Sequence, residues 1–365
     1  MIEPRQPRGT RTGFTTGACA AAAAKAAARV LVRGTLLRSI ESTLPNHAQV
    51  VFALHRCEQR GAVALCSIIK DAGDDPDCTH GAELVAEVRL TSDGEIRLAR
   101  GPGIGVVTKP GLGLLVGGPA INPVPSRNIR DMVREELEPG RGAEVTLSVP
   151  GGEEMAKQTL NARLGILDGI SILGTTGIVK PYSTAAYRAS VVQAIDVAME
   201  QGETTLVLTT GGKSEQFAMV LFPHLPEVAF VQVGDFIGTG VRYCAKRQVA
   251  KVHVVGMIGK LSKMADGQMQ THAAGSEVNL ALLAGLVAEL GAPAALQAEV
   301  RAANTARHVL EICSAAGYTG LATLVCREAA GHCSRHAAGP LSLESHLVDF
   351  DGRLLGDYAV PRRTT

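Results

Sequence analysis

The pattern of apolar and polar positions changes character near residue 165. Before that point, short runs rich in β-branched residues are mixed with helix signals, whereas strand-like and helix-like stretches alternate regularly beyond it. The first part opens with an alanine-rich run, which predicts a helix because alanine has the highest helix propensity. Thr15 or Thr16 is expected to cap its start and Gly34 to end it. The pattern predicts an α+β domain over residues 1–165.

Within this domain, short apolar runs bounded by turn residues predict strands at 36–44, 49–56, 62–70, 83–90 and 143–149. Asp93-Gly94 is expected to form a hairpin turn. Helices are expected at 126–137 and 153–163. The stretch 101–125 is rich in glycine and proline and too long for an ordinary connector. Apolar residues alternate through it, so we expect it to be ordered.

Beyond residue 165, strand-like stretches at 169–173, 204–208, 228–233 and 251–255 are each followed by a glycine-bearing turn and, for the first three, a predicted helix. Repeated β–α units are typical of a parallel, doubly wound sheet. We therefore expect a Rossmann-like α/β domain over residues 166–345. The remaining segment, 346–365, is expected to form a hairpin centred on Asp351-Gly352 and a tail.

Ligands of open parallel sheets bind beyond the carboxyl ends of the strands. Glycines there let a ligand approach the backbone, and helix N-termini offer unpaired N–H groups. A single such turn is more simply explained by ordinary α/β turn chemistry, so the prediction depends on their succession. The candidate cofactor-binding residues come from these turns: Gly174, Thr175, Thr176, Gly177, Thr209, Thr210, Gly211, Gly212, Asp235 and Gly238.

The turns match neither of two common phosphate-binding motifs. Residues 211–214 end like a P-loop, but Val207 stands where the motif needs a glycine, and residues 234–238 do not fit the dinucleotide fingerprint. An adenosyl ligand without a phosphate therefore suits them better than ATP or NAD. Asp235 is expected to accept ribose hydroxyls or, alternatively, to cap the next helix.

Composition narrows the possible functions. A formal net charge of +1 and 3% aromatic residues argue against nucleic-acid binding, which needs positive charge and stacking platforms. The eight cysteines form no C-x-x-C pair and are interpreted as reduced thiols of a cytoplasmic protein. Lys25 and Arg29 interrupt the alanine run, so we expect neither a membrane span nor a secretory signal.

Four aspartates and a histidine lie between Lys70 and Gly81. They could bind a hard metal ion, but the EF-hand pattern is absent and acidic Gly/Pro turns are commonly solvated loops. Asp71 and His80 are instead the candidates for proton transfer. The His332–His336 segment, with Cys326 upstream, lacks paired zinc-ligand spacing. We therefore expect no metal site formed by the protein.

The chain contains several long, distinctive motifs: RTGFTTGACA at 11–20, KDAGDDPD at 70–77 with THG at 79–81, GPGIGVVTKPGL at 101–112, AINPVP at 120–125, LGTTGIV at 173–179 and GDFIG at 234–238. Together they resemble the cobalt-precorrin-5B C(1)-methyltransferase family. The similarity runs from about residue 10 to 280, and little is similar after about residue 300. Cys78 is an unexpected residue within its acidic turn.

This resemblance implies methyl transfer from S-adenosylmethionine to C-1 of cobalt-precorrin-5B, giving cobalt-precorrin-6A in cobalamin biosynthesis. Cobalt would enter only as part of the substrate, and whether the macrocycle contains it stays open. We expect the strand-end turns to hold the methyl donor and the first domain to hold the tetrapyrrole. The candidate substrate-binding residues are Thr15, Thr16, Lys109, Asn122, Arg127 and Lys180.

Two alternatives remain: a nucleotide-dependent ligase or kinase, and a non-catalytic tetrapyrrole carrier. Neither nucleic acid nor a membrane is an expected partner. The resemblance leaves open whether the chain forms a homo-oligomer or makes transient contact with neighbouring enzymes of the pathway.

Overall fold

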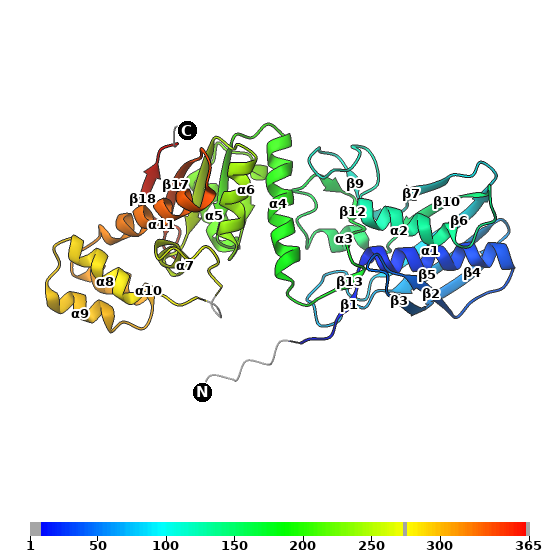
Figure 1. The fold of residues 1–365 in the computed structure, drawn as a ribbon, viewed down its shortest axis with the longest axis horizontal. Helices are drawn as coiled ribbons and strands as arrows, with labels where there is room; N and C mark the ends of the chain where they lie inside the picture. The colour runs from blue at the N-terminus through cyan, green and yellow to red at the C-terminus, as the bar shows by residue number, and fades with distance from the viewer. Residues whose placement is uncertain (1–8, 273–275, 363–365) are drawn as a thin grey trace. The chain divides into compact units, whose positions relative to one another are not determined.

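The computed structural model describes residues 9–272 and 276–362. The chain divides into two compact units, Met1–Thr184 and Ala185–Thr365, where the sequence pattern had suggested a boundary near residue 165. Each unit combines helices with a sheet, so the protein has a mixed α/β fold (Figure 1). Within the described ranges, no helix is both long enough and apolar enough to cross a membrane.

The N-terminal unit is built around a five-stranded sheet and a buried helix. Its helices are α1 (Thr16–Arg33), α2 (Pro123–Arg134) and α3 (Gly152–Ala156). Its longer strands are β2 (Ser39–Thr43), β3 (Gln49–Ala53), β4 (Arg56–Arg60), β5 (Val63–Ile69), β6 (Glu83–Thr91), β7 (Ile96–Arg100) and β10 (Gly142–Ser148). Two-residue strands complete it: β1 (Gly13–Phe14), β8 (Gly103–Ile104), β9 (Val106–Val107), β11 (Ile166–Leu167), β12 (Gly169–Ile170) and β13 (Ile178–Val179).

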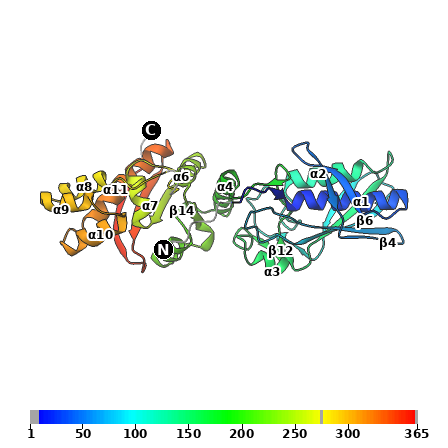
Figure 2. The ribbon, with the colours of Figure 1, turned by 90° about the horizontal axis from the view of Figure 1, so that it is seen from below.

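The alanine helix α1 forms the core of this unit. It is buried along nearly its whole length, packed against β5, β6 and α2, because alanine side chains let neighbouring elements approach from all sides. Figure 2 shows α1 and α2 side by side along the sheet. The predicted ends are confirmed: the Thr15 hydroxyl accepts a hydrogen bond from the Ala18 amide, and Gly34 adopts the left-handed conformation.

The strand order β4-β5-β6-β10-β7 contradicts the predicted hairpin at Asp93-Gly94. β10 lies between β6 and β7, antiparallel to the first and parallel to the second. The Asp93 carboxylate accepts hydrogen bonds from Thr91 Oγ1 and the Glu95 amide, which stabilises the turn. β6 and β7 nevertheless do not pair with each other. The gap that remains is filled by a strand from further along the chain.

Three other predictions for this unit need correction. α2 begins at Pro123 rather than at Ser126, because proline suits the first turn of a helix. α3 ends at Ala156, since the following residues form turns rather than the expected helix to 163. The stretch 169–173 does not belong to the parallel sheet: β12 pairs with β8, where Gly169 lies close to the Gly103 backbone.

The C-terminal unit contains a second five-stranded sheet in the order β15-β14-β16-β17-β18. The first four strands are parallel, and β18 is antiparallel to β17. The strands are β14 (Thr205–Thr209), β15 (Phe230–Gln232), β16 (Lys251–Gly256), β17 (Ser342–Val348) and β18 (Leu354–Val360). The predicted C-terminal hairpin is thus part of this sheet.

Helices cover both faces of this sheet. α5 packs on one face through Ala218 near Val207, whereas Gly240 of α6 contacts Leu208 on the other. α11 packs with both α6 and α7. The helices are α4 (Thr184–Glu200), α5 (Gly212–Leu221), α6 (Ile237–Lys246), α7 (Ile258–Ala265), α8 (Leu280–Glu289), α9 (Ala294–Arg301), α10 (Ala306–Ala315) and α11 (Leu321–Ala337), with a short 3₁₀ turn at Glu227–Ala229.

Candidate functional site

The carboxyl edge of β14 and β16 is where this topology opens the sheet. After β14 the chain continues through α5 to β15, on one side of the pair, whereas after β16 it leads through further helices to β17 on the other. Turns that leave adjacent parallel strands in opposite directions create a crevice that commonly binds ligands. The predicted residues Thr209, Thr210, Gly211 and Gly212 lie at this point.

Backbone groups at this edge are open. A side chain placed on Gly211 or Gly259 would meet no atom within 4 Å, so the backbone there faces open space. Among the described residues, the N-termini of α5, α6 and α7 have no side-chain cap. The buried hydroxyl of Thr209 likewise has no hydrogen-bond partner. Unpaired donors of this kind suit an anionic or hydroxyl-bearing ligand.

Asp235 follows β15 at the same edge. Its Oδ1 accepts hydrogen bonds from Lys260 Nζ at 2.9 Å and from Thr271 Oγ1 at 3.2 Å. Lys260 also donates to the Thr210 carbonyl, which joins the turns after β14 and β15. Within the described residues no group donates to Oδ2 of Asp235, so this oxygen can accept from a ligand. Gly238 differs, because it is buried against Met269 and His336.

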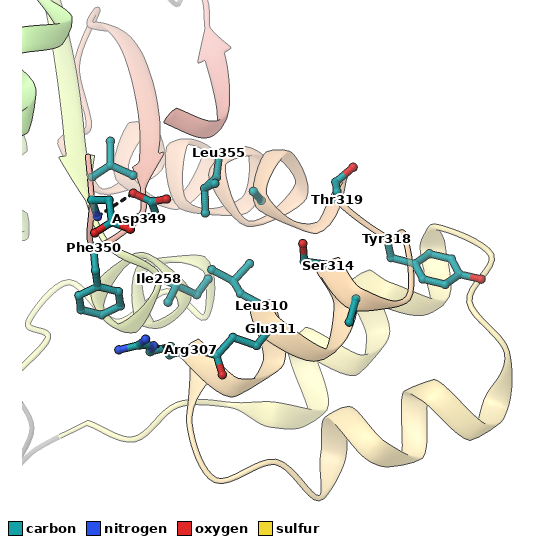
Figure 3. A pocket seen from close by; sticks show the side chains of 14 residues that line it. Ile258, Arg307, Leu310, Glu311, Ser314, Tyr318, Thr319, Asp349, Phe350 and Leu355 are labelled. Atoms are coloured by element: carbon teal, nitrogen blue, oxygen red, sulfur yellow. Dashed lines mark hydrogen bonds and ion pairs between the residues drawn. The ribbon is translucent and has the colours of Figure 1, made fainter. Parts of the chain in front are cut away.

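A cavity of about 580 Å³ adjoins the carboxyl end of β17 (Figure 3). Arg307 and Glu311 of α10 form an ion pair at its rim, and the guanidinium lies 4.7 Å from the centre of the Phe350 ring. Lys213, in the first turn of α5, lies 5.8 Å from the same ring. The cavity is lined by Ile258, Arg307, Leu310, Glu311, Ser314, Ala315, Tyr318, Thr319, Ala322, Val348, Asp349, Phe350, Asp351 and Leu355.

Sequence reasoning did not identify this cavity. Apart from Ile258 of α7, its lining lies within residues 307–355, on α10, α11, β17, β18 and the turns between them. The turn at Asp351-Gly352 was expected only to close a hairpin. No local motif marks Phe350 or Arg307, so their proximity follows from the tertiary fold alone. A volume of this size is within the usual range of small-molecule sites.

The predicted residues Gly174–Gly177 lie in the N-terminal unit and not at the sheet edge. Gly174 packs against the Thr15 side chain, and the Gly177 carbonyl accepts a hydrogen bond from the Thr15 amide. The Thr16 hydroxyl accepts from the Leu173 amide at 2.9 Å. The strand-end argument for a cofactor therefore does not apply to Gly174, Thr175, Thr176 and Gly177, because the preceding strand, β12, pairs only with β8 and is not part of the C-terminal sheet.

The acidic turn, residues 70–81, is bound to its own chain. Arg11 forms a two-pronged ion pair with Asp71, and its backbone N–H donates to Asp74 at 2.8 Å. Gly13 and Gly73 make this approach possible, because a Cβ on either would lie 2.1–2.2 Å from the facing backbone. The two motifs RTGFTTG and KDAGDDPD therefore form one packed structure.

The remaining aspartates of the turn also have partners. Asp75 accepts from the Tyr182 amide at 2.9 Å. Asp77 forms an ion pair with Lys70 Nζ at 2.6 Å, and the Lys70 side chain is 1% exposed. Burial by itself would raise the pKa of Asp77, but hydrogen bonds from Lys70 and Thr79 outweigh it and lower the pKa. With each carboxylate paired, the turn lacks converging free ligands for a metal ion.

The two proton-transfer candidates lie in this turn. The hydrogen-bonded Arg11 guanidinium, helped by the Gly73 amide, lowers the pKa of Asp71 to about 2. His80 is 54% exposed, and its Nδ1 accepts from the Ala72 amide at 3.1 Å, so the neutral ring carries its proton on Nε2. The structure brings the two side chains close, with His80 Nδ1 3.8 Å from Asp71 Oδ1. His80 must give up its contact with Ala72 before Nδ1 can accept a proton, and the lowered pKa of Asp71 makes its carboxylate a weak base.

The other substrate candidates differ in their surroundings. Thr15 and Thr16 are buried. Asn122 lies at the start of α2, where its backbone N–H donates to the Ile172 carbonyl. Lys109 is half-buried beside Gly165, whereas Arg127 and Lys180 are exposed. Within the described ranges none of these three cations forms an ion pair.

Comparisons with known proteins agree over nearly the whole chain. The family model CbiD matches residues 3–181, and the model CbiD, C-terminal domain, matches residues 270–359. A Leptospira interrogans protein named cobalt-precorrin-5B C(1)-methyltransferase is 58% identical over 95% of both chains. A Thermus thermophilus protein of the same name is 53% identical over 97% of this chain and 96% of its own.

A solved structure is also similar: a cobalamin biosynthesis protein (cbiD) from Archaeoglobus fulgidus. It is 28% identical, with a TM-score of 0.39, and the match covers 69% of this chain and 79% of that one.

Proposed function

This chain belongs to the CbiD family, and we propose that it transfers a methyl group from S-adenosylmethionine to C-1 of cobalt-precorrin-5B, giving cobalt-precorrin-6A. Relatives that bear the name of this activity match at 51–58% identity over nearly the full chain. In the same proposal the C-terminal unit holds the methyl donor and the N-terminal unit holds the macrocycle.

The carboxyl edge of β14, β15 and β16 supports the placement of the donor. Its strand order resembles that of doubly wound, Rossmann-like sheets, which bind nucleoside ligands at such an edge. The observation that carries the proposal is the set of unpaired groups there: open backbone at Gly211 and Gly259, the Thr209 hydroxyl, and Asp235 Oδ2. A ribose can donate to Asp235, and a carboxylate can accept from an uncapped helix N-terminus.

Exposed apolar side chains and unpaired cations support the placement of the macrocycle. Leu115 is 83% exposed and Val116 51% exposed, in the glycine-rich stretch that also carries Lys109. A large, apolar ring with carboxylate side arms needs both kinds of contact. Lys109, Arg127 and Lys180 are the candidates for the carboxylates, since no acidic side chain of the described chain neutralises them.

Catalysis in this proposal is mainly positional. The sulfonium is already a reactive methyl donor, so the protein must hold sulfur, methyl and ring carbon in line at near-attack distance. Removal of a ring proton by Asp71 or His80 stays a prediction, and the contacts of both residues make them better suited to holding the acidic turn in place.

The contacts of Lys213 disfavour the nucleotide-dependent alternative. Its ammonium lies 5.7 Å from the Phe217 ring and 5.8 Å from the Phe350 ring, whereas a P-loop lysine contacts phosphates. A labelling experiment distinguishes the methyltransferase from a non-catalytic carrier. Incubation with cobalt-precorrin-5B and labelled methyl donor should place label in the macrocycle. Binding without label would favour a carrier.

Calorimetric titration with S-adenosylhomocysteine tests where the donor binds. Asp235→Asn is expected to weaken binding about tenfold, because it replaces a charged acceptor for the ribose. Thr271→Val is the matched control, since it removes only the contact on Oδ1 and should leave affinity unchanged. Loss of binding in Phe350→Leu, with Asp235→Asn unaffected, would instead place the donor in the cavity beside β17.

A further inference from the structure

Three side chains from β16 and β17 converge on the face of the sheet that α5 covers. His253 of β16 is paired in register with Glu344 of β17, and His346 follows two residues later on the same face. Residues two apart on a strand point to the same side, which is why the three meet. Among the described residues, their ligating atoms all lie within 4.8 Å of one another.

The distances match those between ligands of one metal ion. His253 Nδ1 lies 2.9 Å from His346 Nε2 and 3.2 Å from Glu344 Oε2, and His346 Nε2 lies 3.7 Å from the same oxygen. Two ligand atoms bound tetrahedrally to zinc, each about 2.05 Å from it, are about 3.3 Å apart. The three separations lie on either side of that value.

Hydrogen bonds satisfy this arrangement only in part. One ring proton can complete the hydrogen bond between His253 Nδ1 and His346 Nε2, and Glu344 Oε2 can then only share that proton. Both histidine side chains are more than nine-tenths buried, so water does not readily fill the gap. A bound cation satisfies all three lone pairs at once.

The surroundings fit metal ligation. Lys251 Nζ binds Oε1 of Glu344 at 2.7 Å, which leaves Oε2 directed at the two histidines. The Phe222 ring lies 4.3 Å from the His253 ring and shields it from solvent. Outer contacts of this kind fix the orientation of metal ligands.

We propose that His253, Glu344 and His346 bind one divalent transition-metal ion of the zinc type, which joins β17 to β16. Two imidazole nitrogens and one carboxylate oxygen form a donor set that suits such ions. The proposal goes beyond methyl transfer and does not depend on it. It also revises the expectation of no metal site, which considered only residues 70–81 and 326–336.

Metal binding is measured on the full-length chain, purified without a histidine tag and stripped with EDTA. Calorimetric titration with Zn²⁺ should show one equivalent bound with a Kd below about 1 µM. Zn²⁺ should also raise the unfolding temperature. Co²⁺ bound in its place should give the visible absorption of a four- or five-coordinate nitrogen–oxygen site, which shows the donor set without any mutation.

Variants locate the ion. Two single variants are made: Glu344→Gln, which keeps the side-chain volume, and His346→Ala. Each should lower Zn²⁺ affinity at least about a hundredfold. His308→Asn removes an exposed histidine of α10 and should bind like the wild type. Uptake below about 0.1 equivalent by the wild type, or equal binding by wild type and Glu344→Gln, would overturn the proposal. If the variants fail to fold, the Co²⁺ spectrum of the wild type still decides it.

Discussion

The two units each gather carboxylate and histidine side chains, but with opposite outcomes. In the acidic turn of the N-terminal unit, the carboxylates are bound by donors of their own unit: Arg11 for Asp71 and Asp74, and Lys70 for Asp77. In the C-terminal unit, His253, Glu344 and His346 face one another. Composition alone would favour the acidic turn as the metal site. What matters is whether the lone pairs diverge toward different donors or converge on one point.

The lysines beside the two clusters differ in their exposure to solvent. Lys70 is 1% exposed and depends on Asp77, whereas Lys251 is 38% exposed and can be hydrated without Glu344. A buried charge that loses its partner has no substitute in water. The acidic turn is therefore expected to be the more fragile of the two under mutation.

Asp77→Ala should have the largest effect. It leaves the buried ammonium of Lys70 unpaired, which typically costs about 3–5 kcal/mol. Chemical unfolding followed by circular dichroism measures the loss, and hydrogen exchange at the α1 amides assigns it to the N-terminal unit.

Asp75→Ala is the control within the same turn. It removes one hydrogen bond, to the Tyr182 amide, and should cost about 1 kcal/mol. Equal effects of the two substitutions would show that the Lys70–Asp77 pair is hydrated and that the contrast between the clusters fails.

Gly73→Ala should rank second, at about 2–3 kcal/mol. Gly73 has a φ of +68°, and a Cβ there would lie 2.2 Å from the Arg11 carbonyl. Gly61 has a φ of +61° with nothing near its Cβ position, so Gly61→Ala should show only the backbone strain of about 1 kcal/mol. The difference in unfolding free energy isolates the contact between the two motifs. No difference would mean that the N-terminal segment moves aside freely.

Sequence patterns predicted the elements that depend on local chemistry. The alanine helix, its Thr15 cap and its end at Gly34 follow from the intrinsic preferences of those residues. The strands at 49–53, 63–69 and 251–256 follow from apolar, β-branched runs. The pairing of strands could not be predicted from local sequence in this way. The position of β10 between β6 and β7 depends on long-range contacts, which the local sequence Asp93-Gly94 does not indicate.

The same limit applies to the sites. Strand-end turns could be found because parallel sheets place ligands at one edge, so Thr209–Gly212 and Asp235 lie where they were expected. Gly174–Gly177 has the same composition, but its preceding strand pairs in the other unit. His253 stands alone in an apolar run, and His346, 93 residues further on, is preceded by Glu344 and Ser345 without a recognised metal motif. Only the register of β16 against β17 brings them together.

Acid should weaken the N-terminal unit through Asp77. The folded-state pKa of Asp77 is lowered by Lys70 and Thr79 despite its burial, so the carboxylate contributes stability above its unfolded pKa of about 4. That contribution is lost as the pH falls through the folded pKa. The free energy of unfolding, measured from pH 6 to 2 and compared with each protein's own value at pH 6, should therefore decline less in Asp77→Asn than in wild type. Parallel curves would mean that Asp77 is not the responsible carboxylate.

Asp71→Asn should have the smallest effect on stability and decides the role of this residue. The side chains of Arg11 and Asp71 are 56% and 47% exposed, so solvent screens their ion pair and it should contribute little to stability. Because Arg11 holds the carboxylate in its charged form, we expect kcat for methyl transfer to fall by less than about tenfold. A general base would lose about a hundredfold or more. Such a loss, with unfolding unchanged and His80→Gln near wild-type activity, would make Asp71 the proton acceptor and the acidic turn part of the catalytic site.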